Sequence, residues 1–329
     1  MDNLIPSRSE MIESLSEKEY DLIVVGGGIT GAGVARDAVL RGLKVALLEK
    51  GDFASGTSSM TSKMLHGGLR YLKNYEFRLV RKAALDRKVH LEIAPHLATV
   101  IELLIPLYNW NEDTPFKLRL GLLFYDLLAF PKQIGKHKNL KNKDLIAKMP
   151  LLENNEIRAG ALYHDVITND ARLTLANCLS AAAGGADVVN YVEMKSWETV
   201  DGEVVVEAID TLNDTEITIT GKYIILCTGP WSQIAEAKGI DFEAKAKVRL
   251  TRGTHVILKK KLDKYACLLI NEDNRPIFLM PGPNYDLAGT TDLDHDNSPD
   301  KVKPTIEEVE YIIKACNKLF PTADYNIDD

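Results

Sequence analysis

The feature that most constrains the fold of this chain is a short apolar run followed by three spaced glycines near its start. The run, residues 21–25, ends in β-branched side chains directly before Gly26, Gly28 and Gly31. This G-x-G-x-x-G spacing predicts a tight strand-to-helix turn, in which the second glycine lets the backbone approach a pyrophosphate. The phosphates would lie on the N–H groups at the positive end of the following helix.

A second apolar run, residues 44–48, ends in Glu49. An acidic residue about 20 residues beyond the glycines is the group that hydrogen-bonds an adenosine ribose in this type of site. Strand, helix, strand and acid together predict a Rossmann-like α/β fold that binds a dinucleotide. A glycine-rich turn without any ligand is the weaker interpretation.

The segment that follows Glu49 is rich in glycine, serine and threonine and too irregular for a single strand or helix. Loops of this length in compact domains are usually functional, so we expect it to donate hydrogen bonds to phosphates or a flavin ring. Its candidate cofactor-binding residues are Ser58, Ser59, Ser62, Lys63, His66 and Gly67. Arg70 and Tyr71 come next and offer a planar fork of donors and a hydroxyl, which suit a phosphate or a carboxylate.

Composition narrows the class of protein. The net charge of −7 over 329 residues argues against nucleic acid as the principal partner. No apolar run reaches the ~20 residues of a spanning helix, and residues 1–18 do not resemble a signal peptide. We therefore expect a cytosolic protein, or one peripheral on a membrane. The cysteines form no C-x-x-C pair, which predicts buried free thiols and no metal site; they are Cys178, Cys227, Cys267 and Cys316.

The most apolar helix expected in the chain covers residues 116–130, with Lys117 and Arg119 near its start. Its pattern fits a buried packing helix and also a helix that rests on a membrane surface, and length does not distinguish the two. Before it, residues 100–107 read as a strand that Pro106 is expected to stop.

Two later strands carry candidate site residues. Residues 223–227 form an apolar run that leads into Gly229. Residues 247–258 alternate as a strand and contain His255. Histidine suits general base work near neutral pH, but a histidine on an isolated strand is more often structural.

Five separated motifs resemble FAD-dependent glycerol-3-phosphate dehydrogenases. They are TSSMTSKMLHGGLRYL with the helix that follows it, YHDVITNDARLTLANCL, CTGPWS, TRGTHVIL and LAGTTD. The similarity extends from about residue 20 to residue 321. The resemblance implies an α/β, Rossmann-like FAD-binding domain of the glutathione-reductase or D-amino-acid-oxidase type, with an inserted α+β substrate domain.

The resemblance also implies a discontinuous domain organisation. Residues 1–18 are expected to be a lead-in, 19–100 and 157–245 the FAD-binding domain, and 101–156 and 246–329 the substrate domain. The family continues with a Gly-Val-Arg-Pro segment, a Gly-Gly-Lys-Leu-Thr-Thr segment and a C-terminal helical domain, none of which occurs in this sequence. We therefore expect a C-terminally truncated chain with a weakened anion site; a functional variant is the alternative.

The activity that the resemblance implies is oxidation of sn-glycerol 3-phosphate to dihydroxyacetone phosphate with reduction of FAD. His255 is expected to take the hydroxyl proton, while Arg70 and Tyr71 orient the substrate. The resemblance adds Gly229 to the cofactor contacts, and Arg252, Thr290 and Thr291 to the substrate contacts. The family more commonly has lysine at position 252, and arginine keeps the charge. Electrons are expected to pass to a membrane quinone, which implies association with the cytoplasmic face of the membrane.

Three alternatives remain open. A glycerol-3-phosphate oxidase would use oxygen, but the insertion found in such oxidases is not present here. An amine or amino-acid oxidase shares the glycine fingerprint, whereas HGGLRYL and RGTH favour a phosphorylated polyol. An inactive FAD-binding fragment is made plausible by the missing segments. A nicotinamide dehydrogenase is less expected because the loop after Glu49 resembles flavoproteins.

Overall fold

The computed structural model describes residues 5–131, 133–152, 156–239 and 248–328, without the side chains of residues 70 and 73. The chain divides into two compact units. Unit 1 comprises Met1–Thr61 and Asn169–Leu250, and unit 2 comprises Ser62–Thr168 and Thr251–Asp329. The described helices include none with the length and apolar character needed to cross a membrane.

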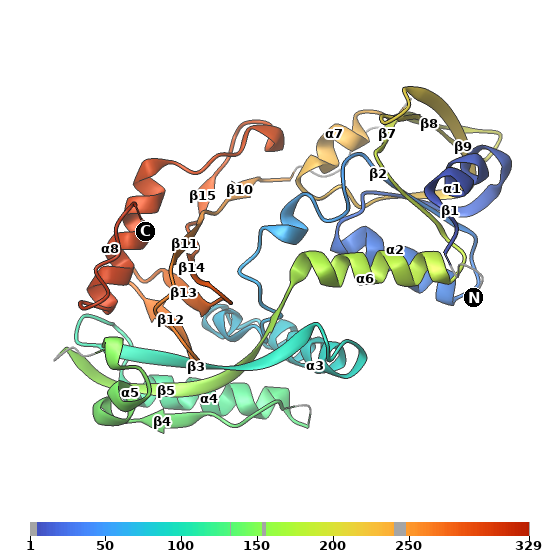
Figure 1. The fold of residues 1–329 in the computed structure, drawn as a ribbon. Helices are drawn as coiled ribbons and strands as arrows, with labels where there is room; N and C mark the ends of the chain where they lie inside the picture. Colours follow the sequence, from blue (N-terminus) through green and yellow to red (C-terminus); the bar gives the residue numbers. More distant parts are fainter. Residues whose placement is uncertain (1–4, 132, 153–155, 240–247, 329) are drawn as a thin grey trace. The chain divides into compact units, whose positions relative to one another are not determined.

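Unit 1 is built on a mixed sheet, which within the described residues has the order β6-β2-β1-β9-β8-β7 (Figure 1). Its strands are β1 (Glu19–Val25), β2 (Val45–Glu49), β6 (Asp187–Asn190), β7 (Val192–Val200), β8 (Glu203–Asp210) and β9 (Thr215–Leu226). β1 pairs in parallel with both β2 and β9, and β2 pairs in parallel with β6. β7, β8 and β9 form an antiparallel meander.

Helices cover both faces of the parallel part of this sheet, which is why its strands are continuous apolar runs. They are α1 (Arg8–Glu17), α2 (Ile29–Leu40), α6 (Asp170–Ala183) and the short α7 (Ser232–Glu236). α2 and α6 lie side by side and pack on Leu22 and Val24 (Figure 1). α1, part of the expected lead-in, packs its Met11 and Leu15 into the core that contains Ile23 of the same strand.

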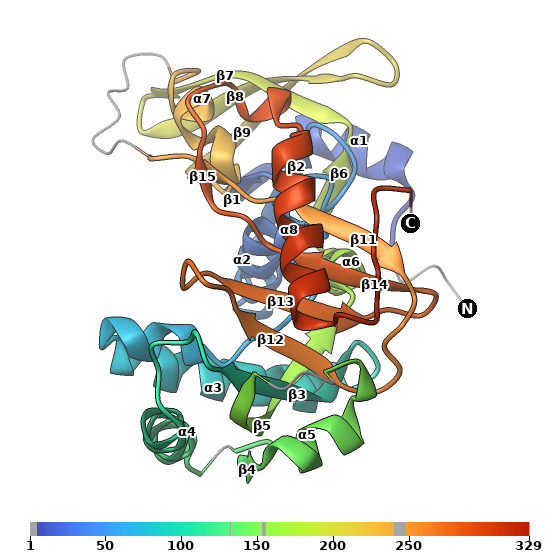
Figure 2. The ribbon, with the colours of Figure 1, turned by 90° about the vertical axis from the view of Figure 1, so that its left-hand side faces the viewer.

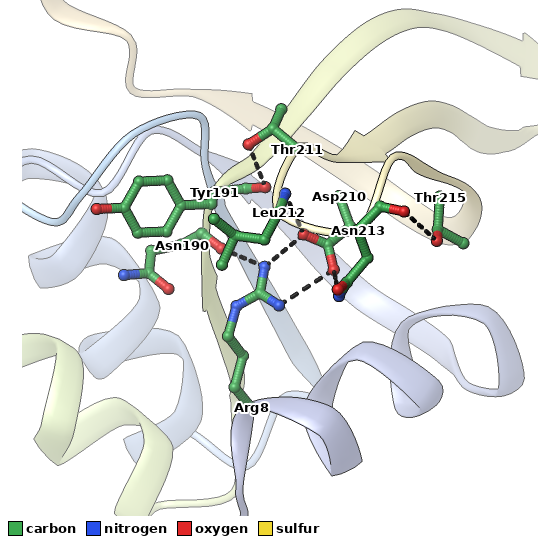
Figure 3. A network of polar contacts seen from close by, with 8 residues as sticks. All are labelled: Arg8, Asn190, Tyr191, Asp210, Thr211, Leu212, Asn213 and Thr215. Atoms are coloured by element: carbon green, nitrogen blue, oxygen red, sulfur yellow. Dashed lines mark hydrogen bonds and ion pairs between the residues drawn. The ribbon is translucent and has the colours of Figure 1, made fainter.

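Arg8 of α1 forms a bidentate ion pair with Asp210 of β8 and so joins α1 to the meander (Figure 3). Arg8 Nη2 donates to Asp210 Oδ1 at 2.7 Å and to the Asn190 carbonyl at 2.9 Å, and Nη1 donates to Oδ2 at 3.1 Å. Asp210 also accepts from the Leu212 amide and the Asn213 side chain. The hydrogen bond from Arg8, helped by these neighbours, lowers the pKa of Asp210 to about 2 against the opposing effect of burial.

Unit 2 contains a second sheet, with the order β11-β14-β13-β12-β3-β5-β4 in the described residues. Its strands are β3 (Ala98–Tyr108), β4 (Lys138–Leu140), β5 (Ile157–Thr168), β11 (His255–Lys259), β12 (Ala266–Ile270), β13 (Pro276–Pro281) and β14 (Tyr285–Gly289). A small ladder joins β10 (Thr251–Arg252) to β15 (Leu293–Asp294). β3 pairs in parallel with β12 and antiparallel with β5 along the whole length of β3.

The helices of unit 2 pack on both sides of this sheet. They are α3 (Phe77–Ile93), α4 (Pro115–Ala129), α5 (Asn142–Lys148) and α8 (Ile306–Leu319). α8 packs against β11 and β14, with Ile312, Cys316 and Leu319 in the same core as Leu258 and Ala288 (Figure 2).

The compact units differ from the expected domain boundaries in three segments. Residues 62–100 and 157–168 belong to unit 2, although the sequence places them in the FAD-binding domain. Residues 248–250 belong to unit 1, although the sequence places them in the substrate domain. The reason for the first two differences is the β3–β5 pair, which runs from Ala98 opposite Thr168 to Tyr108 opposite Ile157, with one shift of register between Leu107 and Tyr108. A strand paired along its whole length with one partner cannot be divided between two units.

Two strand predictions are corrected as well. Pro106 does not end its strand, because β3 continues to Tyr108 and Pro106 pairs with Gly160. The strand expected over residues 247–258 is interrupted at Gly253 and Thr254, which separate β10 from β11. Residue 247 lies outside the described residues.

Candidate functional site

The glycine turn of unit 1 has the geometry that its spacing predicts. Gly26 has φ +110°, and a Cβ there would lie 2.5 Å from the carbonyl oxygen of Cys227, the residue that directly follows β9. A Cβ on Gly31 would overlap the carbonyl oxygen of Gly26. Any larger residue at either position would push the turn away from β9 or from α2.

Gly28 is the N-cap of α2, so the first amides of that helix point out of the turn without an intrahelical acceptor. One of them, the Ile29 N–H, donates to the Ser58 hydroxyl at 2.9 Å. Ser58 lies in a short 3-10 helix, Thr57–Ser59, that reaches back to the turn from the loop after β2. A helix N-terminus with adjacent hydroxyls suits a pyrophosphate, so these residues fit a dinucleotide.

Glu49 lies at the end of β2 and faces the same turn. Its Oε2 accepts the Gly27 N–H at 2.7 Å, and its Oε1 accepts the Gly51 N–H at 2.8 Å. A carboxylate has about four acceptor positions, so each oxygen can still accept a ribose hydroxyl. The carboxylate at this place fits the adenosine half of a dinucleotide.

The loops after β2 and β9 meet beside the turn. Gly229 follows β9 with φ +53° and begins a short 3-10 helix, Gly229–Trp231. A Cβ on Gly56 would lie 3.2 Å from the Trp231 ring, and Lys50 Nζ lies 4.6 Å from the centre of that ring. Both loops follow the carboxyl ends of parallel strands, where ligands bind in sheets of this kind.

In unit 2, His255 is brought close to a residue far away in the sequence. It begins β11, and its Nε2 lies 2.9 Å from the hydroxyl oxygen of Ser62. Across the sheet it pairs with Gly289, where a Cβ would lie 2.7 Å from His255 Cδ2. The imidazole therefore lies against a position that only glycine leaves open.

The two predicted substrate segments, 251–255 and 289–291, pack directly on each other. The Thr254 N–H donates to Thr291 Oγ1 at 2.9 Å, and Thr290 Oγ1 donates to the Thr291 carbonyl at 2.9 Å. Gly253 allows this approach, because a Cβ there would overlap Thr290 Oγ1. The structure thus brings His255 and both threonines into one small region.

Arg252 is partly engaged within unit 2. Its Nη1 donates to the Lys303 carbonyl at 2.6 Å, and its Nη2 pairs with Glu308 Oε2 at 3.1 Å. A guanidinium has five N–H donors, so these contacts use part of its capacity. Its role as a substrate contact stays a prediction.

The predicted residues from Lys63 onward run beside the end of β5. The Lys63 carbonyl accepts the Thr168 N–H at 2.9 Å, and the His66 ring lies 5.7 Å from that of Tyr71. Arg70 and Tyr71 belong to a 3-10 helix, Leu69–Asn74; the side chain of Arg70 lies outside the described part. The cofactor and substrate roles of these residues stay predictions.

Sequence reasoning missed a buried ion pair beneath this segment. Arg87 Nη1 lies 2.8 Å from Asp165 Oδ1, and both side chains are almost fully buried. Arg87 also donates to the Tyr125 hydroxyl at 2.9 Å, and Asp165 accepts the Gly67 N–H at 3.1 Å. The pair thus holds the backbone at Gly67 from inside. Arg87 belongs to a charge-rich helix sequence, where no local pattern marks it as buried.

Three of the four cysteines are buried as expected, and Cys227 is not. All four are free thiols; Cys178, Cys267 and Cys316 are buried, and Cys227 is half-buried. Burial raises the pKa of Cys178 to about 12. In the described residues no group of three or more His, Cys, Asp or Glu side chains is arranged to hold a metal ion.

The fold and the glycine turn define a dinucleotide-binding α/β protein. Comparison with known proteins identifies its family. A model of the FAD dependent oxidoreductase family matches residues 21–329, so the chain belongs to that family. This confirms the predicted fold class, the oxidoreductase class and FAD as the cofactor.

Individual relatives show which members of the family the chain resembles. The chain is 36% identical over 328 residues to the aerobic glycerol-3-phosphate dehydrogenase of Staphylococcus aureus (strain USA300), covering 98% of this chain and 58% of the relative. Among solved structures it is similar to the glycerol-3-phosphate dehydrogenase from Bacillus halodurans complexed with FAD, with 31% identity, a TM-score of 0.78, and coverage of 98% and 57%. The predicted resemblance is therefore confirmed, and the chain spans just over half the length of these relatives.

Its fold also resembles that of the L-α-glycerophosphate oxidase from Mycoplasma pneumoniae with FAD bound, with 21% identity, a TM-score of 0.73, and coverage of 94% and 80%. The glycine oxidase from Geobacillus kaustophilus is similar to the same degree, with 18% identity, a TM-score of 0.73, and coverage of 92% and 78%. These two likenesses concern the fold alone.

Proposed function

We propose that this chain carries the cofactor-binding and substrate-handling residues of a glycerol-3-phosphate dehydrogenase, which oxidises sn-glycerol 3-phosphate to dihydroxyacetone phosphate. The observation that carries the proposal is the contact of His255 with Ser62, beside the packed segments 251–255 and 289–291, whose sequences resemble this family. The similarity to dehydrogenases named for this substrate supports the same choice.

Bound FAD supplies the acceptor for the hydride that leaves the central carbon of the substrate. In unit 1, the turn from Gly26 to Gly31 would hold the pyrophosphate on the amides of α2. Glu49 would accept the ribose hydroxyls, and Ser58 would contact the phosphates beside Ile29. These residues bind the cofactor and take no part in the chemistry.

His255 would remove the proton from the hydroxyl on the central carbon. A neutral imidazole has one acceptor nitrogen, and a base with a pKa near neutrality is suited to this transfer. We assign the transfer to Nδ1, because Nε2 has a single hydrogen-bonding position in the ring plane and faces the Ser62 hydroxyl. The Ser62 hydroxyl would then hold the ring plane toward the substrate, which is where positioning accelerates the reaction.

Arg70 and Tyr71 would bind the substrate phosphate, since a planar guanidinium suits bidentate contact with a phosphate. Arg252 would contribute less than its charge suggests, because Glu308 already neutralises part of it. Thr290 and Thr291 would contact the substrate beside His255.

The proposal is tested by anaerobic titration of the FAD-loaded chain with sn-glycerol 3-phosphate, followed by its visible spectrum. Bleaching of the flavin spectrum is expected, whereas glycine is expected to leave the spectrum unchanged. The variant His255→Ala should keep the flavin bound but not bleach, and His96→Ala, an exposed histidine, should behave like the wild type. Reduction by glycine, or normal bleaching in His255→Ala, would contradict the proposal.

We propose a membrane quinone as the electron acceptor, and peripheral association with the cytoplasmic face of the membrane. The outer face of α4 supports this: Phe116, Leu120, Leu123 and Leu127 are each more than half exposed and lie one helical turn apart. Lys117 and Arg119 stand on the same helix. Oxygen is the competing acceptor, and turnover with a quinone analogue under nitrogen, compared with turnover in air, decides between them.

A further inference from the structure

Glu308 connects the start of α8 with both candidate substrate segments. It forms a capping box with Thr305: the Thr305 N–H donates to Glu308 Oε2 at 3.1 Å, and the Glu308 N–H donates to Thr305 Oγ1 at 3.4 Å. A capping glutamate is usually solvated, but this one is only 4% exposed. Burial of a carboxylate is unfavourable unless its oxygens are hydrogen-bonded, so the remaining partners are informative.

Those partners belong to the site. Glu308 Oε1 accepts the hydroxyl of Thr254 at 2.9 Å and that of Thr291 at 2.8 Å. Oε2 pairs with Arg252 Nη2 at 3.1 Å. Together with the Thr305 amide, these contacts use about all the acceptor positions of one carboxylate.

The charge of Glu308 is maintained inside this cluster. Burial alone raises the pKa of Glu308, but the hydrogen bonds from Thr291 and Thr254, with the Arg252 charge, outweigh burial and hold that pKa below its ordinary value. The ionised carboxylate also orients the Thr291 hydroxyl, which donates to Glu308 and accepts the Thr254 N–H at 2.9 Å. Glu308, Thr254 and Thr291 thus close a ring of hydrogen bonds.

We propose that Glu308 is a positioning residue for the reaction, fixing segment 251–255, with His255, against segment 289–291. The inference rests on the proposed function. Thr254 directly precedes His255, and Gly289, on which the imidazole lies, is two residues before Thr291. Fixing the two threonines therefore fixes the base on its glycine.

The neighbouring residue provides a matched control. Glu307 stands one position earlier in the first turn of α8 and is exposed. An effect on the helix dipole would arise from either glutamate, since both lie in the first turn. An effect through Thr254 and Thr291 arises from Glu308 and not from Glu307.

The test compares Glu308→Ala, Glu308→Gln and Glu307→Ala in the FAD-loaded full chain. Two quantities are measured: the rate of flavin reduction by sn-glycerol 3-phosphate, and backbone hydrogen exchange in both segments and in β13. Glu308→Ala should slow reduction about tenfold, the effect of roughly 1.4 kcal/mol. It should also speed exchange in segments 251–255 and 289–291 but not in β13. Glu308→Gln can turn its amide to bond both threonines and should restore most of the rate, and Glu307→Ala should match the wild type.

The proposal is overturned if Glu308→Ala stays within about twofold of the wild type in both quantities. It is equally overturned if Glu307→Ala has the same effect, or if exchange rises evenly in β13, since either outcome assigns Glu308 a purely structural role. If the wild-type chain binds FAD but is not reduced by sn-glycerol 3-phosphate, the proposed function fails. The exchange pattern then still decides whether Glu308 fixes the two segments.

Discussion

The hydroxyl of Ser62 lies 2.9 Å from Nε2 of His255, although 193 positions separate the two residues in the chain. The contact gives one ring nitrogen a defined partner, and the partner of one nitrogen sets the orientation of an imidazole. The composition of the loop predicts that Ser62 contacts the cofactor. In the fold, the Ser62 hydroxyl instead lies against His255, the candidate base.

Replacing Ser62 by alanine removes this contact and leaves His255 in a wider range of orientations. We expect flavin reduction by sn-glycerol 3-phosphate to slow by up to about tenfold, since one net hydrogen bond contributes roughly 0.5–1.5 kcal/mol. FAD affinity should change little. Stopped-flow absorbance measures the rate, and Ser16→Ala, an exposed serine in α1, is the control. A weaker affinity for FAD, with an unchanged rate of reduction at saturating FAD, would return Ser62 to the cofactor site.

The glycines of α2 provide a second prediction with an internal control. A Cβ on Gly31 overlaps the Gly26 carbonyl, whereas a Cβ on Gly33 meets no atom within 4 Å. Gly31→Ala should therefore abolish FAD binding, and Gly33→Ala should raise the free energy of unfolding by about 0.5–1 kcal/mol, because alanine favours the helix. Titration with FAD and urea unfolding measure the two quantities. Equal FAD affinities in both variants would disprove the assigned role of the turn.

The Arg8–Asp210 contact predicts a dependence of stability on pH. Asp210 has its pKa lowered from 3.8 to about 2 in the folded chain, so the unfolded chain binds this proton more readily. The stabilisation is complete above the unfolded value and disappears as the pH falls through the folded one. Arg8→Met keeps the apolar stem and should lower the free energy of unfolding by about 1–2 kcal/mol at neutral pH. The difference should shrink in acid.

Urea unfolding at a series of pH values measures this difference. Arg41→Met breaks the exposed pair with Asp37 and serves as the control, for which we expect almost no change. A difference between Arg8→Met and the wild type that stays constant down to the lowest pH at which both fold would mean that packing of Arg8, not its charge, matters.

Local signals in the sequence predict unit 1 well, because the strand, glycine turn, helix and Glu49 are contiguous and each follows from its own pattern. The capping box at Thr305 and Glu308 is readable in the same way. The contacts of Glu308 with Thr254 and Thr291 cannot be predicted from local sequence, because these residues belong to distant segments that the fold brings together. For the same reason the domain boundary expected at residue 157 separates β5 from β3, because only their pairing shows that both strands belong to one unit.

The exposed face of α4 leads to the last prediction. Phe116, Leu120, Leu123 and Leu127 form one stripe, opposite Leu122, Tyr125 and Ala129, which are buried. An apolar stripe on a helix with basic residues near its start should bind vesicles that contain anionic lipid more tightly than neutral ones.

The double variant Leu123→Asp and Leu127→Asp should weaken binding to anionic vesicles by about tenfold or more, because burial of each leucine contributes roughly 1.5–3 kcal/mol at most. Its flavin spectrum should not change. Leu212→Asp, an equally exposed leucine in unit 1, is the control and should bind like the wild type. Co-sedimentation with vesicles measures the binding. If the double variant binds as tightly as the wild type, the stripe on α4 is not a membrane surface.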